Sequence, residues 1–358
     1  MTLRSARFCS FLMFLQFLSG CSGASPSEGS SQRVLPWLRS GDSVSQTLPV
    51  IPLPSTRRLL YVTSATPYFF SAYRLPLHSG QGPKIRMTGV NEPVPIANDN
   101  NDLYVGSFND GTIYTYALPL APTFDQSESA TRYAEDSYAA PFARTRPRGP
   151  NDTPSPASSG GVPSGLGNLS GLAANGEYLY VAGASPRDER VLEYRIPFVT
   201  GEKPSGSVTG FSMFDFVGIA VTNKTLYAAS TVNGTVGAYT LPLKADERPA
   251  YTIGTNPQSD GASGVAVNGN GTRLYVSLYS VGIVDEFKLP YQPGEKPKVL
   301  DVESETGGRP YGISVAGDHL FVTAGDIYAY RLPLMSNSQP DAVVPFSDGF
   351  AAGVAAGR

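Results

Sequence analysis

Six residues with polar or aromatic side chains lie just before, or at the start of, short apolar segments that recur along the chain. They comprise three carboxylates, one amide, one guanidinium and one phenol ring: Asp215, Asp260, Asp348, Asn168, Arg309 and Tyr311. If the apolar segments surround one axis, these side chains ring a single opening and can bind a sugar, a cation or a lactone there. The alternative is that the Asp and Asn residues only cap local turns, which they commonly do.

Catalytic groups of other kinds are scarce. The two histidines, His78 and His319, fall at predicted turns away from that opening, and no G-x-S-x-G motif opens a helix. Cys9 and Cys21 are the only thiols. If Cys9 is removed with an N-terminal signal segment, disulfides and cysteine-based zinc sites are excluded. We predict no catalytic residue and no dedicated metal site, although axial carboxylates can hold calcium or another divalent cation.

The composition favours an all-β protein. The 358 residues include 38 Gly, 31 Pro, 20 Tyr and 17 Phe, a balance typical of many short strands joined by turns. The formal net charge is −3 and there is no run of Lys and Arg. Because phosphate binding requires a basic surface, nucleic acid is not a predicted partner.

An internal repeat of six copies indicates the architecture. Each copy begins with Leu, an aromatic residue and Val or Ala, and the aromatic residues are Tyr61, Tyr104, Tyr180, Tyr227, Tyr275 and Phe321. A second aromatic residue follows after 9–14 positions, and a proline always stands three positions later: Pro76, Pro119, Pro197, Pro242, Pro290 and Pro333. Because similar spacings recur in all six copies, the sequence predicts a repeated supersecondary unit.

One repeat has the pattern of a four-stranded propeller blade. The Leu-aromatic-Val segment has the content of a buried strand, and the alternating segment after it is a second strand that the proline ends. Another proline, seven positions on in five copies, opens a short outer strand. Small apolar segments such as Gly264-Val265-Ala266 form the innermost strands. The repeats therefore predict a six-bladed β-propeller over residues 58–358.

The two ends of this region complement each other. The last residues, from Gly353 onward, have the pattern of an inner strand but precede no Leu-aromatic-Val segment. The first such segment, at residues 60–62, has no inner strand before it. We predict that blade 1 takes its inner strand from the C-terminus and its other strands from the N-terminal end. This clasp closes the ring and removes two sheet edges.

One interval between repeats is much longer than the others. Pro119 and Pro197 are 78 residues apart, whereas the equivalent prolines elsewhere are 43–48 residues apart. The excess falls at residues 121–165, which are rich in Ser, Pro, Ala and Arg. We predict a partly disordered insertion near the outer strand of blade 2.

The first 57 residues have a different character. Arg4 and Arg7 precede an apolar segment at residues 8–18 that is too short to span a bilayer about 30 Å thick, so residues 1–20 are predicted to be a signal peptide. Leu18-Ser19-Gly20-Cys21 resembles the lipobox of bacterial lipoproteins, which implies acylation of Cys21. Residues 21–57, rich in Ser, Gly and Pro, are then a tether that holds the domain at the cell envelope, facing the periplasm or the cell exterior.

Two repeat units, at residues 264–290 and 218–243, resemble the YVTN-type repeat of bacterial propellers, which belongs with lactonase-like and NHL-type propellers. The resemblance covers about residues 58–358 and implies the fold, because the motif builds strands and turns. Lactonase-like relatives often have seven blades. Gluconolactonase-type relatives have six blades and hold a metal with acidic and Asn ligands, and no motif here matches those ligands residue by residue.

The predicted function is that of a membrane-tethered, monomeric binding or scaffold propeller for a protein or glycan partner. It rests on the expected anchor, the regular repeats and the scarcity of histidines and thiols. The runner-up is a metal-assisted, lactonase-like hydrolase with the axial carboxylates as metal ligands. The third hypothesis is an assembly component of an envelope complex.

Overall fold

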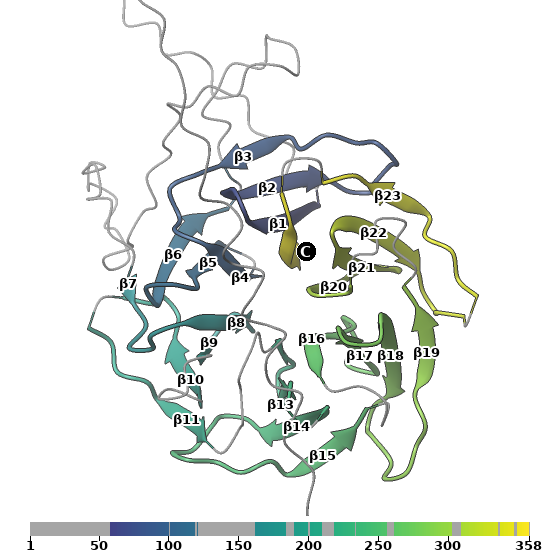
Figure 1. Ribbon diagram of the computed structural model, residues 1–358. Coiled ribbons are helices and arrows are strands. Elements are labelled where there is room, and N and C mark those ends of the chain that lie inside the picture. Colours follow the sequence, from purple (N-terminus) through teal and green to yellow (C-terminus); the bar gives the residue numbers. More distant parts are fainter. Residues whose placement is uncertain are drawn as a thin grey trace, which may run out of the picture. The chain divides into compact units, whose positions relative to one another are not determined.

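The computed structural model describes residues 58–99, 101–118, 120, 162–183, 190–199, 201–209, 218–232, 234–255, 261–302, 309–335, 337–346 and 349–357. Within these residues there is no helix, and the strands form six separate, four-stranded antiparallel sheets. The sheets are arranged as the blades of a ring (Figure 1). The all-β class and the six-bladed propeller predicted from the repeats are therefore confirmed.

The first three blades, each given from the axis outward, have the following strands. Blade 1 contains β24 (Ala351–Ala356), β1 (Leu59–Ala65), β2 (Tyr68–Arg74) and β3 (Ile85–Met87). Blade 2 contains β4 (Pro93–Asn98), β5 (Asp102–Ser107), β6 (Thr112–Ala117) and β7 (Val162–Pro163). Blade 3 contains β8 (Leu169–Ala174), β9 (Tyr178–Gly183), β10 (Arg190–Arg195) and β11 (Gly206–Thr209).

The remaining blades repeat the same order. Blade 4 contains β12 (Ile219–Val221), β13 (Thr225–Ser230), β14 (Thr235–Thr240) and β15 (Tyr251–Gly254). Blade 5 contains β16 (Ala262–Val267), β17 (Arg273–Leu278), β18 (Ile283–Lys288) and β19 (Lys298–Asp301). Blade 6 contains β20 (Ile313–Ala316), β21 (His319–Ala324), β22 (Asp326–Arg331) and β23 (Ala342–Val344).

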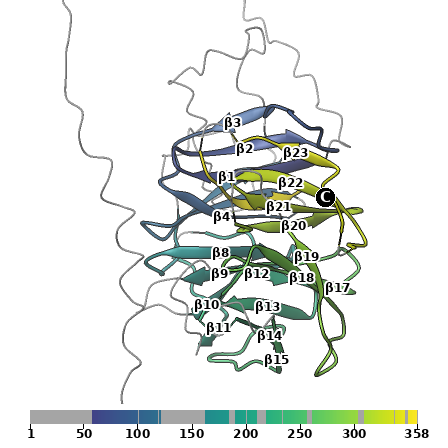
Figure 2. The ribbon, with the colours of Figure 1, turned by 45° about the vertical axis from the view of Figure 1, so that its right-hand side comes forward.

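The innermost strands surround a central axis. β4 contacts both β24 and β8, and the series of contacts continues through β12, β16 and β20 back to β24. In each blade the other strands follow one another outward, as β1, β2 and β3 do (Figures 1 and 2). Every loop that enters an inner strand therefore lies at the same end of the axis.

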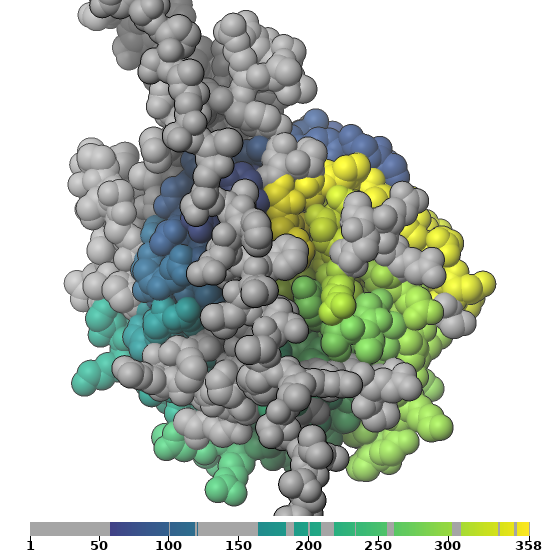
Figure 3. All heavy atoms as spheres, in the orientation of Figure 1, coloured from purple at the N-terminus to yellow at the C-terminus, as the bar shows by residue number. Residues whose placement is uncertain are grey.

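The predicted clasp in blade 1 is confirmed. β24, from the C-terminal end, pairs antiparallel with β1, with Leu60 opposite Ala356 and Val62 opposite Val354. The backbone N–H of Gly357 also donates to the carbonyl of Leu59 over 2.7 Å. Figure 3 shows the yellow C-terminal residues directly beside the purple and blue residues of the N-terminal strands. The ring is thus closed by main-chain hydrogen bonds between the two ends of the domain.

The repeated sequence motifs have the structural roles expected of them. The Leu and the aromatic residue that open each copy are buried, as Leu60 and Tyr61 are at 0% and 3% exposure. The third strand of every blade ends immediately before its Leu-Pro or Ile-Pro pair, so proline is not required to donate to the ladder. The outer strands of five blades begin one or two residues after the second proline.

Glycines on the inner strands allow neighbouring blades to approach closely. A Cβ atom at Gly218 would lie 2.6 Å from Gly264 Cα, and one at Gly264 would lie 2.5 Å from the carbonyl oxygen of Tyr311. The same holds for Gly312 and Gly353, whose Cβ atoms would meet carbonyl oxygens of the next blade at 2.4 and 2.2 Å. The glycine in the repeated inner segment is therefore required by packing at the axis.

Buried hydroxyl groups on three consecutive blades, 5, 6 and 1, each join their own blade to the next one. Thr63 Oγ1 accepts from the backbone N–H of Gly353 in its own blade and donates to the carbonyl of Val94 in blade 2, both over 2.8 Å. Ser277 makes the same two bonds to Gly264 and Tyr311, as Thr323 does to Gly312 and Ala352. These residues all follow the Leu-aromatic-Val segment, where blades 2, 3 and 4 carry Gly106, Ala182 and Ala229.

Several sequence predictions concern other parts of the chain. The signal peptide at 1–20, Cys21 and the tether at 21–57 lie outside the residues that the structure describes, as does most of the predicted insertion, 121–161. Val162–Pro163, inside the range predicted for the insertion, forms the outer strand of blade 2 by pairing with β6. Of the described residues, none belongs to a helix with the length and apolar character needed to cross a membrane.

Candidate functional site

The antiparallel order of the strands gives the propeller two distinct faces. The entry face carries the loops that lead into the inner strands and those that join the second strand to the third. The turn face carries the turns from the inner to the second strand and from the third to the outer strand. The six residues predicted to bind a ligand all precede inner strands, so the topology assigns those that are described to the entry face.

The central channel itself is narrow. Its cavity is about 80 Å³ and is lined by inner-strand residues of all blades, most of them Gly, Ala, Val, Ile, Leu and Pro. Polar side chains in this lining come from Ser170, Ser263 and Tyr311. Since pockets for small organic ligands usually measure roughly 300–1,000 Å³, this channel is several times smaller than such a pocket, and its mouth is the candidate site on the entry face.

Three aromatic rings and one arginine gather at the mouth. Tyr311, which precedes β20, contacts Tyr279 edge-to-face at a centroid distance of 5.9 Å and Phe350 at 5.7 Å. The Arg309 guanidinium lies over the Tyr279 ring, 5.4 Å from its centroid. All three rings are half-buried and Arg309 is exposed. We call this group of residues from blades 5, 6 and 1 the mouth cluster.

The structure brings together two of the predicted site residues, Arg309 and Tyr311. Asn168 precedes β8, so it belongs to the same face but to blade 3, on the opposite side of the ring from blade 6. Asp215, Asp260 and Asp348 lie outside the described residues, and their part in a site stays a prediction. No cluster of three metal-ligating His, Cys, Asp or Glu residues is found within the described portion of the chain.

Two members of the mouth cluster, Tyr279 and Phe350, were not predicted. The sequence contains a signal for both, because Tyr279 directly follows β17 and Phe350 directly precedes β24, and both positions lead to the entry face. What the sequence does not contain is their distance from Tyr311. A guanidinium held over an aromatic ring leaves its N–H groups available for oxygen acceptors, while exposed ring faces pack on apolar C–H surfaces.

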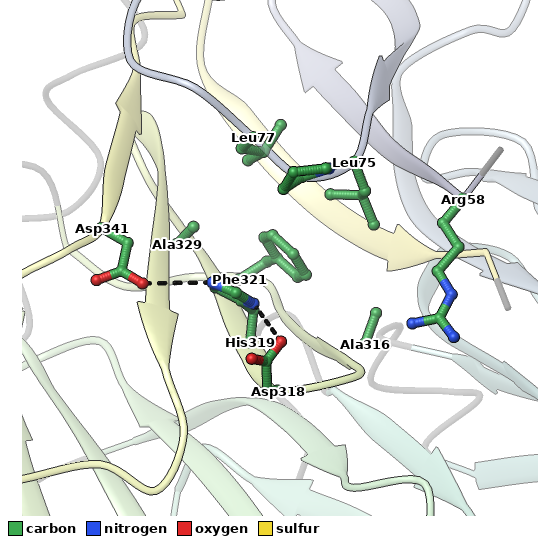
Figure 4. Close-up of a pocket in the computed structure, with 10 residues that line it drawn as sticks. Arg58, Leu75, Leu77, Ala316, Asp318, His319, Phe321, Ala329 and Asp341 are labelled. Atoms are coloured by element: carbon green, nitrogen blue, oxygen red, sulfur yellow. Dashed lines mark hydrogen bonds and ion pairs between the residues drawn. The ribbon is translucent and has the colours of Figure 1, made fainter.

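A larger cavity, of about 270 Å³, opens on the turn face between blades 6 and 1 (Figure 4). We call it the seam cleft, because it adjoins the blade that the two ends of the domain build together. Leu75, Pro76 and Leu77 of blade 1 form one wall, and Phe321 and Ala329 of blade 6 face them. Its charged lining residues are Arg58, Asp318 and Asp341, with His319 between the two carboxylates.

His319 is held by both carboxylates. Its Nδ1 contacts Asp318 Oδ1 at 2.8 Å, its Nε2 lies 3.4 Å from Asp341 Oδ2, and its ring stacks on Phe321 at 6.2 Å. The hydrogen bond from His319 is the main reason that the pKa of Asp318 lies below its ordinary value. The sequence predicted His319 in a turn, whereas it is the first residue of β21, directly after the turn. Nothing in the sequence indicated that it lines a cavity.

Comparison with known proteins supports the fold. The sequence matches neither a protein-family model nor a curated protein. A solved chain from a nidogen/laminin complex is 12% identical with a TM-score of 0.53, and the match covers 84% of this chain and 98% of that chain. A protein of unknown function from Desulfotomaculum acetoxidans is 10% identical with a TM-score of 0.51, covering 82% and 83%. At such identities the likeness shows the propeller fold alone.

Proposed function

We propose that this protein is a membrane-tethered, extracytoplasmic propeller lipoprotein that binds a protein or glycan partner at the mouth of its channel. The observation that carries the proposal is the mouth cluster, in which Arg309 and three half-buried rings come together above a channel several times smaller than a usual ligand pocket. Such a surface binds a partner from outside the ring and does not enclose it.

The chemistry of the mouth cluster suits a partner with both apolar and oxygen-bearing surface. Tyr279, Tyr311 and Phe350 offer rigid rings that lose little conformational entropy on binding, and such residues dominate the energetics of many interfaces. Arg309 adds hydrogen-bond donors for a carbonyl, hydroxyl or carboxylate oxygen. A sugar ring has both kinds of surface, as does a loop of a protein partner.

The tether is the second part of the proposal. The predicted signal peptide and the lipobox-like Leu18-Ser19-Gly20-Cys21 support acylation at Cys21. The first described residue, Arg58, leads into β1 at the end that belongs to the turn face. The chain from the proposed anchor therefore joins the propeller on the face opposite the mouth cluster.

Binding to an immobilised panel of envelope glycans and envelope proteins tests the proposal. We expect the wild-type protein to retain at least one of them, and Arg309→Gln and Tyr279→Ala each to weaken that binding at least about tenfold. The matched control is Arg195→Gln, an exposed arginine at the turn-face end of β10. Retention that is equal in wild type and in both mouth variants would contradict the proposal.

A further inference from the structure

The seam cleft adjoins a cross-strand pair at which blade 6 carries smaller side chains than blades 3 and 5 do. In blade 3 this pair is Tyr180 opposite Glu193, and in blade 5 it is Tyr275 opposite Glu286. The equivalent pair in blade 6 is Phe321 opposite Ala329. Blade 6 therefore lacks both the phenol hydroxyl and the carboxylate at this position.

The bonds of Glu193 show what occupies the equivalent space elsewhere. Glu193 is 1% exposed, and its Oε2 accepts from the backbone N–H of Leu243 in the next blade over 3.0 Å. Leu243 has the same place in its repeat as Leu77, which lines the seam cleft. Blades 1 and 4 also carry an alanine at this position, but it lies opposite a tyrosine, whereas Ala329 lies opposite Phe321. The seam cleft lies where blade 6 has neither the glutamate nor the phenol hydroxyl.

The open cleft has an apolar middle and oppositely charged ends. Leu75, Pro76 and Leu77 on one side and Phe321 on the other are apolar. Figure 4 shows Arg58 at one end and Asp341 at the other, with Asp318 below the apolar wall. Arg58 makes no ion pair with any residue that the structure describes.

The two carboxylates that line the cleft, Asp341 and Asp318, each have an oxygen that can accept a further hydrogen bond. Asp341 Oδ2 contacts His319 and, at 3.3 Å, the Nε of Arg331, and Oδ1 takes part in neither contact. Arg331 is 70% exposed, so solvent screens its pair with Asp341 strongly. Asp318 uses only Oδ1 for His319. Two carboxylates therefore face the cleft with one oxygen each available to an ammonium group.

We propose that the seam cleft binds a small linear zwitterion, an ω-amino acid or a molecule with the same layout. Its carboxylate pairs with Arg58, its ammonium group lies at Asp341, and its methylene chain packs on Phe321 and the Leu75–Leu77 wall. Such a ligand matches both charged ends and the apolar middle, whereas a singly charged ligand leaves one end uncompensated. This site lies on the opposite face from the mouth cluster and does not depend on the function proposed there.

A homologous series of ligands tests the proposal with the full chain. Calorimetry and thermal unfolding would compare 3-aminopropanoate, 4-aminobutanoate, 5-aminopentanoate and 6-aminohexanoate with hexylamine and hexanoate. For so few atoms we expect a dissociation constant of roughly 1 mM for the best zwitterion. Because each singly charged ligand loses the charge-assisted hydrogen bonds at one end of the cleft, both should bind at least about tenfold more weakly.

Variants separate the two ends of the cleft. Arg58→Gln and Asp341→Asn lie at its exposed rim and should each weaken zwitterion binding about tenfold, while Arg58→Gln leaves hexylamine binding unchanged. Ala329→Leu fills the cleft and should abolish binding of every ligand. Asp301→Asn, an exposed aspartate on β19 of blade 5, is the matched control and should bind as wild type does.

Three results would overturn the proposal. The first is that no ω-amino acid binds or raises the melting temperature. The second is that hexylamine or hexanoate binds as tightly as the best zwitterion, which would show that only one end of the cleft is used. The third is that Arg58→Gln and Asp341→Asn both retain full affinity. None of these outcomes bears on partner binding at the mouth cluster, which is measured with different variants.

Discussion

Replacing Thr63 by valine should weaken the closure of the ring. The hydroxyl of Thr63, 0% exposed, connects three segments, since it lies on β1, accepts from Gly353 on β24 and donates to Val94 on β4. Valine has nearly the same shape but neither donates nor accepts. Thr63→Val therefore leaves the half-buried N–H of Gly353 and the buried carbonyl of Val94 without this partner, at the point where the two ends of the domain meet.

The magnitude follows from the two bonds lost. Each bond, at 2.8 Å, is short enough for full strength, and a typical buried hydrogen bond contributes about 1 kcal/mol net. An orphaned buried group costs about 1–3 kcal/mol, so two fully buried groups would cost about 2–6 kcal/mol. Because the Gly353 N–H is only half-buried, we expect the lower part of this range, about 2–4 kcal/mol. Thr63→Ser keeps the hydroxyl and removes one methyl group, which costs only about 1 kcal/mol.

Urea unfolding of the wild-type protein and the variants measures this difference. Thr240→Val is the matched control, because Thr240 is an exposed residue at the end of β14 and its loss should change stability by less than about 0.5 kcal/mol. Amide exchange at Gly353 should be faster in Thr63→Val than in Thr63→Ser. The reasoning is refuted if Thr63→Val is as stable as the control, or if the serine variant loses as much as the valine variant.

Two further predictions concern alkaline stability and the anchor. Burial raises the pKa of Tyr61 from 10.0 to about 12. The neutral phenol therefore makes its full contribution to stability below pH 10, and this contribution is lost as the pH rises through 12. At pH 11 the free energy of unfolding is lower by about 1.4 kcal/mol. The free energy of unfolding, measured with urea, should fall less between pH 9 and pH 11 for Tyr61→Phe than for wild type. An equal fall in both proteins would contradict this prediction. Cys21→Ser should abolish incorporation of labelled palmitate and release the protein from membranes, and retained label or membrane association would speak against acylation at Cys21.

The sequence by itself determined the blades and how they close. Leucine, an aromatic residue and proline recur at nearly constant spacings. These spacings follow from the alternation of side chains along a strand and from the inability of proline to donate a ladder hydrogen bond. Both requirements act within a single repeat. The count of strand types at the two ends then sufficed to predict the clasp of β24 on β1. The face on which Arg309 and Tyr311 lie could be predicted for the same reason, because both precede an inner strand; their part in a site stays a prediction.

Only the tertiary structure decided which residues meet between blades. Tyr279, Tyr311 and Phe350 come from three blades, and no spacing in the sequence encodes their distances of 5.7–5.9 Å. The seam cleft likewise depends on the register that places Phe321 opposite Ala329 and on the contact of blade 6 with Leu77. The physical reason is that contacts between blades depend on the volumes of side chains far apart in the sequence, whereas the repeat pattern records only the requirements of each strand.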